Sequence, residues 1–223
     1  IGQTLMQEIS MLVQTEESFG YMLSSVRRRV LDVNDESLLV NAAKNIDEAI
    51  AIAKKRKVFV SESILVGSAN DKNAVIIEVS PENFGVYKVL NSSQLVCTNH
   101  FQSEAYKDDE RNQKQIAVSH SKYRYEKLQE LLNENPKLNP KKMASILRDK
   151  SGLKGEKIGY GNEKALNQLL AHYAVIFSPE KRLVWVSSNP YQLGEFVCYD
   201  LNRIFSDERL KTGEFATSNL NIA

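Results

Sequence analysis

Two polar side chains, an asparagine and an arginine, stand where this chain could do chemistry. Asn99 lies near the end of the apolar stretch Leu95–Phe101, and Arg124 lies in the segment Ser121–Tyr125 near the start of a predicted helix. A neutral amide can donate hydrogen bonds to a developing oxyanion, and a guanidinium can hold a substrate carboxylate. Together the two residues predict one side of an acyl-transfer site.

The nucleophile of such a site is harder to find. The first residue is Ile1, and no Cys, Ser or Thr stands at the start. Cys97 is an internal candidate, but strand alternation would point His100 to the opposite face of its strand. We therefore expect Cys97 to be a packed thiol, and a Cys–His pair using His120 or His172 is the competing hypothesis.

Each candidate also has a simpler explanation. Asn99 could end a strand and satisfy a turn, as asparagine often does. Arg124 could be a solvated helix residue, and Ser121 could be the N-cap of its helix. Glu78, between Ile77 and Val79, is either exposed at a sheet edge or paired inside, and the pattern leaves both alternatives open.

The apolar periodicity predicts an α+β fold. Helical spacing of apolar residues over residues 1–33 predicts one or two amphipathic helices, and Asn45 with Glu48 forms a capping box for the next helix. Later helices are predicted over residues 121–133 and after Asn139, with loops over residues 102–115 and 151–162. Predicted strands cover residues 63–69, 74–80, 86–90, 95–99, 171–177, 182–188 and 196–201. The short links between the first four strands allow antiparallel pairing only.

Composition excludes several classes of protein. The chain has 223 residues, a net charge of +1, 42% hydrophobic residues and 26% charged residues. A dedicated nucleic-acid binder would show a strong basic excess, so no nucleic-acid partner is expected, and the basic runs Arg27–Arg29 and Lys54–Lys57 are expected to be solvated helix faces. No apolar run is long enough for a membrane span.

A series of short motifs, taken in order, resembles a known family over about residues 38–201. The motifs are Asn45–Ile50, Ser61–Val66, Val75–Pro81, Thr98–Phe101, Ser121 with Arg124 and Tyr125, Ala171–Phe177, Leu183–Ser187 and Pro190–Gln192. Their order and spacing resemble the acyl-CoA:6-aminopenicillanic acid acyltransferase-like family, a branch of the N-terminal-nucleophile hydrolases related to choloylglycine hydrolases.

The resemblance implies an αββα sandwich of two antiparallel sheets and an N-terminal Cys freed by self-cleavage of a precursor. It implies that Asn99 holds the oxyanion and that Ser121 and Arg124 bind the substrate, a small acyl-amide or thioester. No metal or organic cofactor is implied. Residues 1–37 do not match the nucleophile half of the family. We therefore expect a helical segment over residues 1–37 and the later part of the sandwich over residues 38–223.

Two hypotheses follow for the activity. In the first, this chain is part of a hydrolase or acyltransferase acting on linear amide C–N bonds, and an upstream segment of the same precursor supplies the Cys. In the second, the chain is a non-catalytic binding or scaffolding relative of the same fold. A Cys in a cleavage context upstream of Ile1 would favour the enzyme.

Overall fold

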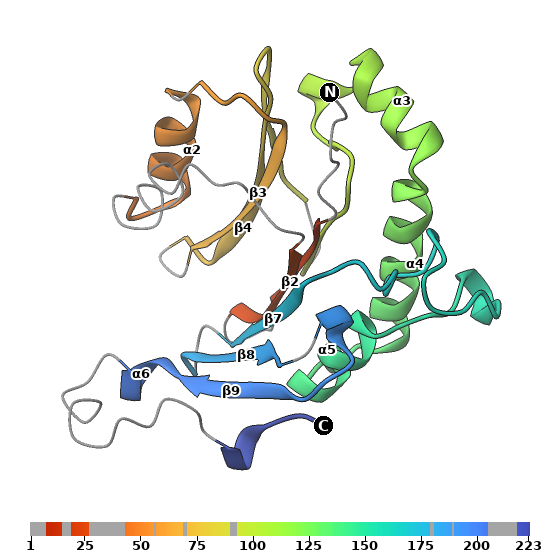
Figure 1. Ribbon diagram of the computed structural model, residues 1–223. Helices are drawn as coiled ribbons and strands as arrows, with labels where there is room; N and C mark the ends of the chain where they lie inside the picture. The colour runs from red at the N-terminus through yellow and green to blue at the C-terminus, as the bar shows by residue number, and fades with distance from the viewer. Residues whose placement is uncertain are drawn as a thin grey trace.

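The structure, a computed structural model, has an α+β fold in which two antiparallel sheets lie between helices (Figure 1). It describes residues 8–14, 19–26, 43–55, 57–68, 71–89, 93–178, 181–188, 190–204 and 218–223. The predicted α+β class and the two antiparallel sheets are confirmed.

The larger sheet has six strands in the order β6-β1-β2-β7-β8-β9, and all of its pairings are antiparallel. Its strands are β1 (Glu8–Gln14), β2 (Phe19–Val26), β6 (Gln94–Cys97), β7 (Tyr173–Ser178), β8 (Leu183–Ser187) and β9 (Phe196–Asp200). Ser10 pairs with Cys97, so the amino end of β1 lies beside the carboxyl end of β6. Strand β6 is an edge strand of this sheet.

The smaller sheet has three strands, β3 (Glu62–Ser68), β4 (Asn73–Val79) and β5 (Phe84–Tyr87), again antiparallel. Val75, Ile77 and Val79 of β4 pack against helix α2 (Ile46–Lys54). Ile76, on the opposite face of the same strand, packs with Leu95 and Cys97 of β6. The alternation of β4 therefore places α2 on one face of the small sheet and the large sheet on the other.

The remaining helices gather mainly in the second half of the chain. They are α3 (Glu110–Val118), α4 (Ser121–Glu134), α5 (Pro140–Leu147) and α6 (Leu201–Ile204), with short 3₁₀ turns η1 (Glu104–Tyr106), η2 (Leu153–Gly155), η3 (Pro190–Gln192) and η4 (Ser218–Leu220). Asn139 caps α5, since its side chain accepts a hydrogen bond from the backbone N–H of Lys142 at 2.9 Å. The predicted proline at the first helical position, Pro140, follows it.

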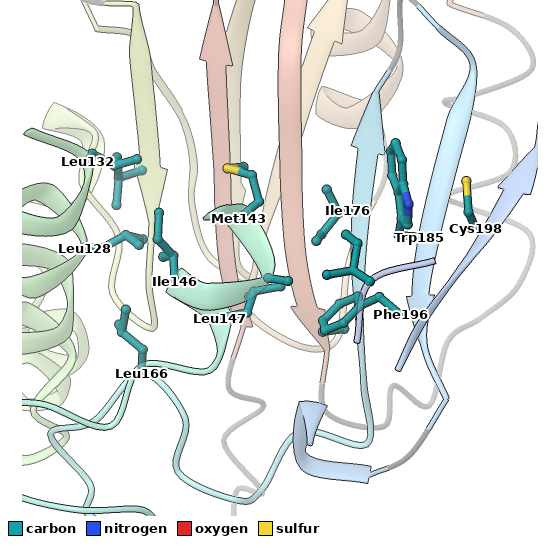
Figure 2. Close-up of a cluster of buried hydrophobic side chains, with 14 residues drawn as sticks. Leu128, Leu132, Met143, Ile146, Leu147, Leu166, Ile176, Trp185, Phe196 and Cys198 are labelled. Atoms are coloured by element: carbon teal, nitrogen blue, oxygen red, sulfur yellow. The ribbon is translucent and has the colours of Figure 1, made fainter. Parts of the chain in front are cut away.

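The largest core lies where α4 and α5 cover the outer face of the large sheet (Figure 2). Leu128 and Leu132 of α4 and Met143 of α5 are fully buried. They pack in one cluster with buried side chains of β7, β8 and β9, which are Ala174, Ile176, Trp185, Phe196 and Cys198. Each large apolar side chain buried here contributes roughly 1.5–3 kcal/mol to folding. The layers therefore follow the order helix, sheet, sheet, helix.

Two predictions of local structure are wrong. Residues predicted to be helical within 1–33 form strands β1 and β2, and these strands pair inside the large sheet between β6 and β7. The helical segment expected over residues 1–37 is therefore absent from the described part of that range. The predicted loop over residues 102–115 contains η1 and most of α3. The β1–β2 hairpin is fixed by pairing with β6 and β7, which leaves no local signal. Helix α3 is capped locally by Asp109 but buries no apolar residue, so helical periodicity does not reveal it.

Most of the other strands and helices lie within a few residues of their predicted ranges, whereas α6 and the turns η2, η3 and η4 were not predicted. Strands β3 to β9 and helices α2, α4 and α5 were all predicted from alternation, helical spacing or capping residues. None of the helices that the structure describes combines the length and apolar character that a membrane crossing needs.

Candidate active site

The candidate site lies in the segment Thr98–Ser103, where the chain leaves edge strand β6 and reaches the small sheet. Before this segment, Val96 packs in the core beneath α4 and α5. After it, Tyr106 of η1 donates a hydrogen bond from its hydroxyl to the carbonyl of Asn83 in the β4–β5 turn, at 2.6 Å. The segment therefore bridges the two sheets, and Asn99 lies within the bridge.

The structure brings Asn99 and Arg124 into direct contact. The Nη2 of Arg124 donates to the Oδ1 of Asn99 at 2.9 Å. A guanidinium has only donors, so this contact identifies the amide oxygen of Asn99 and turns its NH₂ group the other way. Arg124 thereby fixes the orientation of the Asn99 amide.

Arg124 itself is held inside the protein and is only 3% exposed. Its Nη1 donates to the backbone carbonyls of Ser119 at 2.9 Å and Glu163 at 2.6 Å. Three hydrogen bonds of this guanidinium thus go to protein oxygens, one of them the side-chain oxygen of Asn99. The predicted contact between Arg124 and a substrate remains a prediction, and the observed geometry supports an action through Asn99.

The start of α4 has an unusual backbone. The N-cap residue is His120, with φ of 51° in the left-handed region, and its side chain makes no capping hydrogen bond. Its backbone carbonyl accepts from the N–H of Arg124 at 3.1 Å. Its Nε2 lies 3.7 Å from a carboxylate oxygen of Glu163. A left-handed non-glycine residue costs on the order of 1–2 kcal/mol, so the turn that presents Arg124 is held by its surroundings.

Ser121 is the first residue of α4, and its fully buried side chain bonds to the segment that carries Asn99. Its Oγ lies 2.8 Å from the Nδ1 of His100 and donates to the Oγ1 of Thr98 at 3.0 Å. The hydroxyl of Thr98 in turn donates to the backbone carbonyl of Ser121 at 3.2 Å. These bonds attach α4 to the residues on both sides of Asn99. The prediction that Ser121 binds the substrate is untested, and the N-cap position belongs to His120.

The imidazole of His100 is kept neutral. Burial, followed by the positive charges of Arg124 and Lys122, lowers the pKa of His100 to about 4. The ring also packs edge-on against Tyr125, with centroids 5.9 Å apart. A base with so low a pKa is a poor proton acceptor near neutral pH, so His100 acts as a hydrogen-bonding partner of Ser121.

Asn112 and Glu78 also hold the segment that carries Asn99, and the sequence did not identify either of them as a site residue. The side chain of Asn112 in α3 accepts from the N–H of Phe101 at 2.9 Å and donates to the carbonyl of the same residue at 3.0 Å. The carboxylate of Glu78 in β4 accepts from the N–H groups of Gln102 and Ser103. Asn112 stood in a charged stretch without a pattern, whereas a lone carboxylate in an apolar strand was the available signal for Glu78.

The contacts that the structure gives for Cys97, the alternative nucleophile, do not include a histidine. Cys97 is 1% exposed and packs with Ile76 and Leu95 between the sheets, as expected for a packed thiol. Its Sγ makes a weak contact with the carbonyl of Thr98 at 3.5 Å. His172 is exposed just before β7. No group of three or more His, Cys, Asp or Glu residues able to hold a metal ion occurs among the described residues.

With fold and site described, comparison with known families identifies the class of protein. The model of the acyl-coenzyme A:6-aminopenicillanic acid acyl-transferase family matches residues 38–190, which include Glu78, Asn99, Ser121 and Arg124. The chain belongs to this family. A search of curated proteins found no match.

Proposed function

We propose that this chain forms the oxyanion-stabilising side of an N-terminal-nucleophile enzyme that hydrolyses linear amide C–N bonds or transfers their acyl groups. The observation that carries the proposal is the contact of Arg124 with Asn99, at the end of an edge strand, in a chain of this family. The substrate is a small acyl-amide or thioester.

In the proposed reaction, a Cys supplied by an upstream segment of the same precursor attacks the substrate carbonyl carbon through its sulfur. The α-amine of that Cys takes the thiol proton, because its pKa lies near neutrality. The carbonyl oxygen becomes an oxyanion and receives hydrogen bonds from the NH₂ group of Asn99. Collapse of the intermediate breaks the C–N or C–S bond, the α-ammonium returns its proton to the departing amine or thiol, and the acyl group stays on the Cys as a thioester. Water or an acceptor amine then attacks the thioester, its proton passes through the α-amine to the sulfur, and the acid or the new amide leaves with the thiol regenerated.

Within this scheme Arg124 and Ser121 are proposed to lie on the substrate side of the site. Arg124 orients the Asn99 amide, and its positive charge lies close enough to strengthen the donor character of that amide. Ser121 keeps Thr98 and His100 against α4. In this scheme neither Arg124 nor Ser121 exchanges a proton with the reacting atoms.

The test combines this chain with its upstream segment and measures the hydrolysis of acyl-amides and the transfer of acyl groups to amines. Asn99→Ala should lower kcat by about a hundredfold or more, with a much smaller change in KM, because the oxyanion exists only after attack. The control is Asn133→Ala, at an exposed position of α4. Unchanged activity in Asn99→Ala would remove the assigned role.

The non-catalytic alternative predicts a different result from the same preparation. A chain that only binds would show no turnover with any acyl-amide or thioester, whichever segment is added. N-terminal sequencing of the natural protein separates the two hypotheses further, because an enzyme of this class exposes an N-terminal Cys after self-cleavage.

A further inference from the structure

Glu78 is a carboxylate buried in the middle of the small sheet. It lies in β4 between Ile77 and Val79 and has no exposed surface. Ile77 and Val79 pack toward α2, so alternation directs Glu78 to the opposite face, which the large sheet covers. The sequence left its environment open, and the structure shows that it is paired inside.

The partners of Glu78 are backbone amides of the segment that carries Asn99. One carboxylate oxygen accepts from the N–H of Gln102 at 2.6 Å and the other from the N–H of Ser103 at 2.8 Å. Burial raises the pKa of Glu78, and these hydrogen bonds oppose that rise. Burying a carboxylate is costly, and apolar residues of similar volume are often at least as stabilising. Packing of the sheet alone therefore does not explain a glutamate here.

The strand opposite Glu78 is also shaped for this contact. Gly85 pairs directly with Glu78 in the β4–β5 ladder. A Cβ on Gly85 would collide with the side chain of Ser103 and lie 3.1 Å from the Cβ of Ala105. The missing side chain lets the chain after the site approach the small sheet closely enough for both amides to reach the carboxylate.

The segment is held along its whole length by bonds of this kind. Thr98 and His100 bond to Ser121, Asn99 bonds to Arg124, and Phe101 bonds to Asn112. The side chain of Gln102 donates to the carbonyl of Val96 at 2.9 Å. Glu78 is the anchor at the far end, and it is contributed by the other sheet.

We infer that Glu78 is a positioning residue, which fixes the backbone after Asn99 and so sets where the Asn99 amide lies relative to Arg124. Its catalytic meaning rests on the proposed function, whereas its effect on Asn99 is a property of this chain that can be measured without any substrate. The competing explanation is a purely structural bond between the sheets, which would leave Asn99 unmoved when it is broken.

The experiment uses NMR on this chain. Backbone amide hydrogen exchange is followed at Gln102 and Ser103, and the side-chain NH₂ resonances of Asn99 report its environment. In the unmodified protein both backbone amides should be protected, although neither lies in a helix or strand. Glu78→Gln places an NH₂ donor against one of the two N–H donors. It should lower protection at that amide at least tenfold and shift the Asn99 resonances, while the core amides of α4 stay protected.

Two further variants sharpen the result. Gly85→Ala keeps the carboxylate but pushes Ser103 away, so it should reproduce the loss of protection and the shift of Asn99. Glu82→Gln is the matched control, because Glu82 is an exposed carboxylate in the β4–β5 turn that pairs with Arg111. It should change neither signal.

The inference is overturned if Gln102 and Ser103 exchange freely in the unmodified protein, a result that needs no variant to fold. It is equally overturned if either site variant folds, loses protection at these amides and leaves the Asn99 resonances in place. In the complete enzyme, Glu78→Gln should lower kcat roughly ten- to hundredfold with little change in KM. If the NMR result holds but Asn99→Ala retains full activity, the proposed function fails and the positioning role stands.

Discussion

The segment Thr98–Ser103 is held from two sides by different chemistry. On the α4 side, helix residues bond to side chains of the segment. The guanidinium of Arg124 donates to the Asn99 amide, and the hydroxyl of Ser121 bonds to the imidazole of His100. On the side of the small sheet an anion, Glu78, accepts hydrogen bonds from the backbone amides of Gln102 and Ser103. The helix side therefore sets the orientation of functional groups, and the sheet side sets the path of the chain that carries them.

The largest effect should come from removing the helix-side cation. Arg124→Met leaves the carbonyls of Ser119 and Glu163 and the Oδ1 of Asn99 without this donor. The free energy of unfolding should fall by about 2–4 kcal/mol, because buried acceptors lose charge-assisted bonds. Urea denaturation measures the change. Arg111→Met, at an exposed arginine paired with Glu82, is the control and should stay within about 0.5 kcal/mol. A similar small change in both variants would contradict the comparison.

On the sheet side, crowding the contact should cost less than losing the cation. Gly85→Ala introduces a methyl group against Ser103 and Ala105. The expected loss of stability is about 1–3 kcal/mol, the usual range for overpacking. Thermal unfolding of this variant and of the unmodified chain tests it. An unchanged Tm would mean that the chain after the site moves freely away from the small sheet.

Asn112 of α3 contacts the segment between these two sides. Its side chain accepts from the backbone N–H of Phe101 and donates to the backbone carbonyl of Phe101. Asn112→Ala should lower the free energy of unfolding by about 1–2 kcal/mol, since buried backbone groups lose their partners. Chemical denaturation beside Asn133→Ala as a surface control provides the measurement. Equal stability of the two variants would show that the flanking anchors suffice without Asn112.

The response to acid should differ in sign between the two sides. The pKa of His100 is lowered to about 4, so an unfolded chain binds a proton that the folded chain does not, and stability is lost as pH falls from 6.5 toward 4. The pKa of Glu78 is raised by burial, so the folded chain takes up a proton at a higher pH than the unfolded chain. The contribution of Glu78 to the free energy of unfolding therefore increases as the pH falls.

Variants separate these two contributions. Compared with the unmodified chain, His100→Gln should lose less stability between about pH 7 and about pH 5, and Glu78→Gln should lose more. Denaturation curves at the two pH values decide the matter. A His100→Gln variant with the full acid response would show that the imidazole is not the group responsible.

Local patterns predicted much of the frame and part of the site. Alternation marked β4 and β6, and Asn45 and Asn139 marked the starts of α2 and α5. Asn99 and Arg124 were assigned to one site from the order of motifs, and their hydrogen bond is consistent with that assignment. The strand hairpin β1–β2 was mistaken for helices, because its apolar residues also fit helical spacing and only pairing with β6 and β7 makes it a sheet.

Other parts could not be predicted for physical reasons. Helix α3 buries Asn112 and no apolar residue, so it has no hydrophobic stripe that a pattern could reveal. The left-handed backbone conformation of His120 is imposed by the turn into α4 and not by the residue itself. The environment of Glu78 depends on amides that lie more than twenty residues later in the chain.

Because the bridge from β6 to η1 belongs to both sheets at once, the Asn99 amide senses their relative placement. A slide of one layer over the other would draw Glu78 and Arg124 apart and displace the Asn99 amide from the position that it has in the proposed site. Under the proposed function, a ligand bound between the layers far from this edge would slow the reaction without touching any reacting atom.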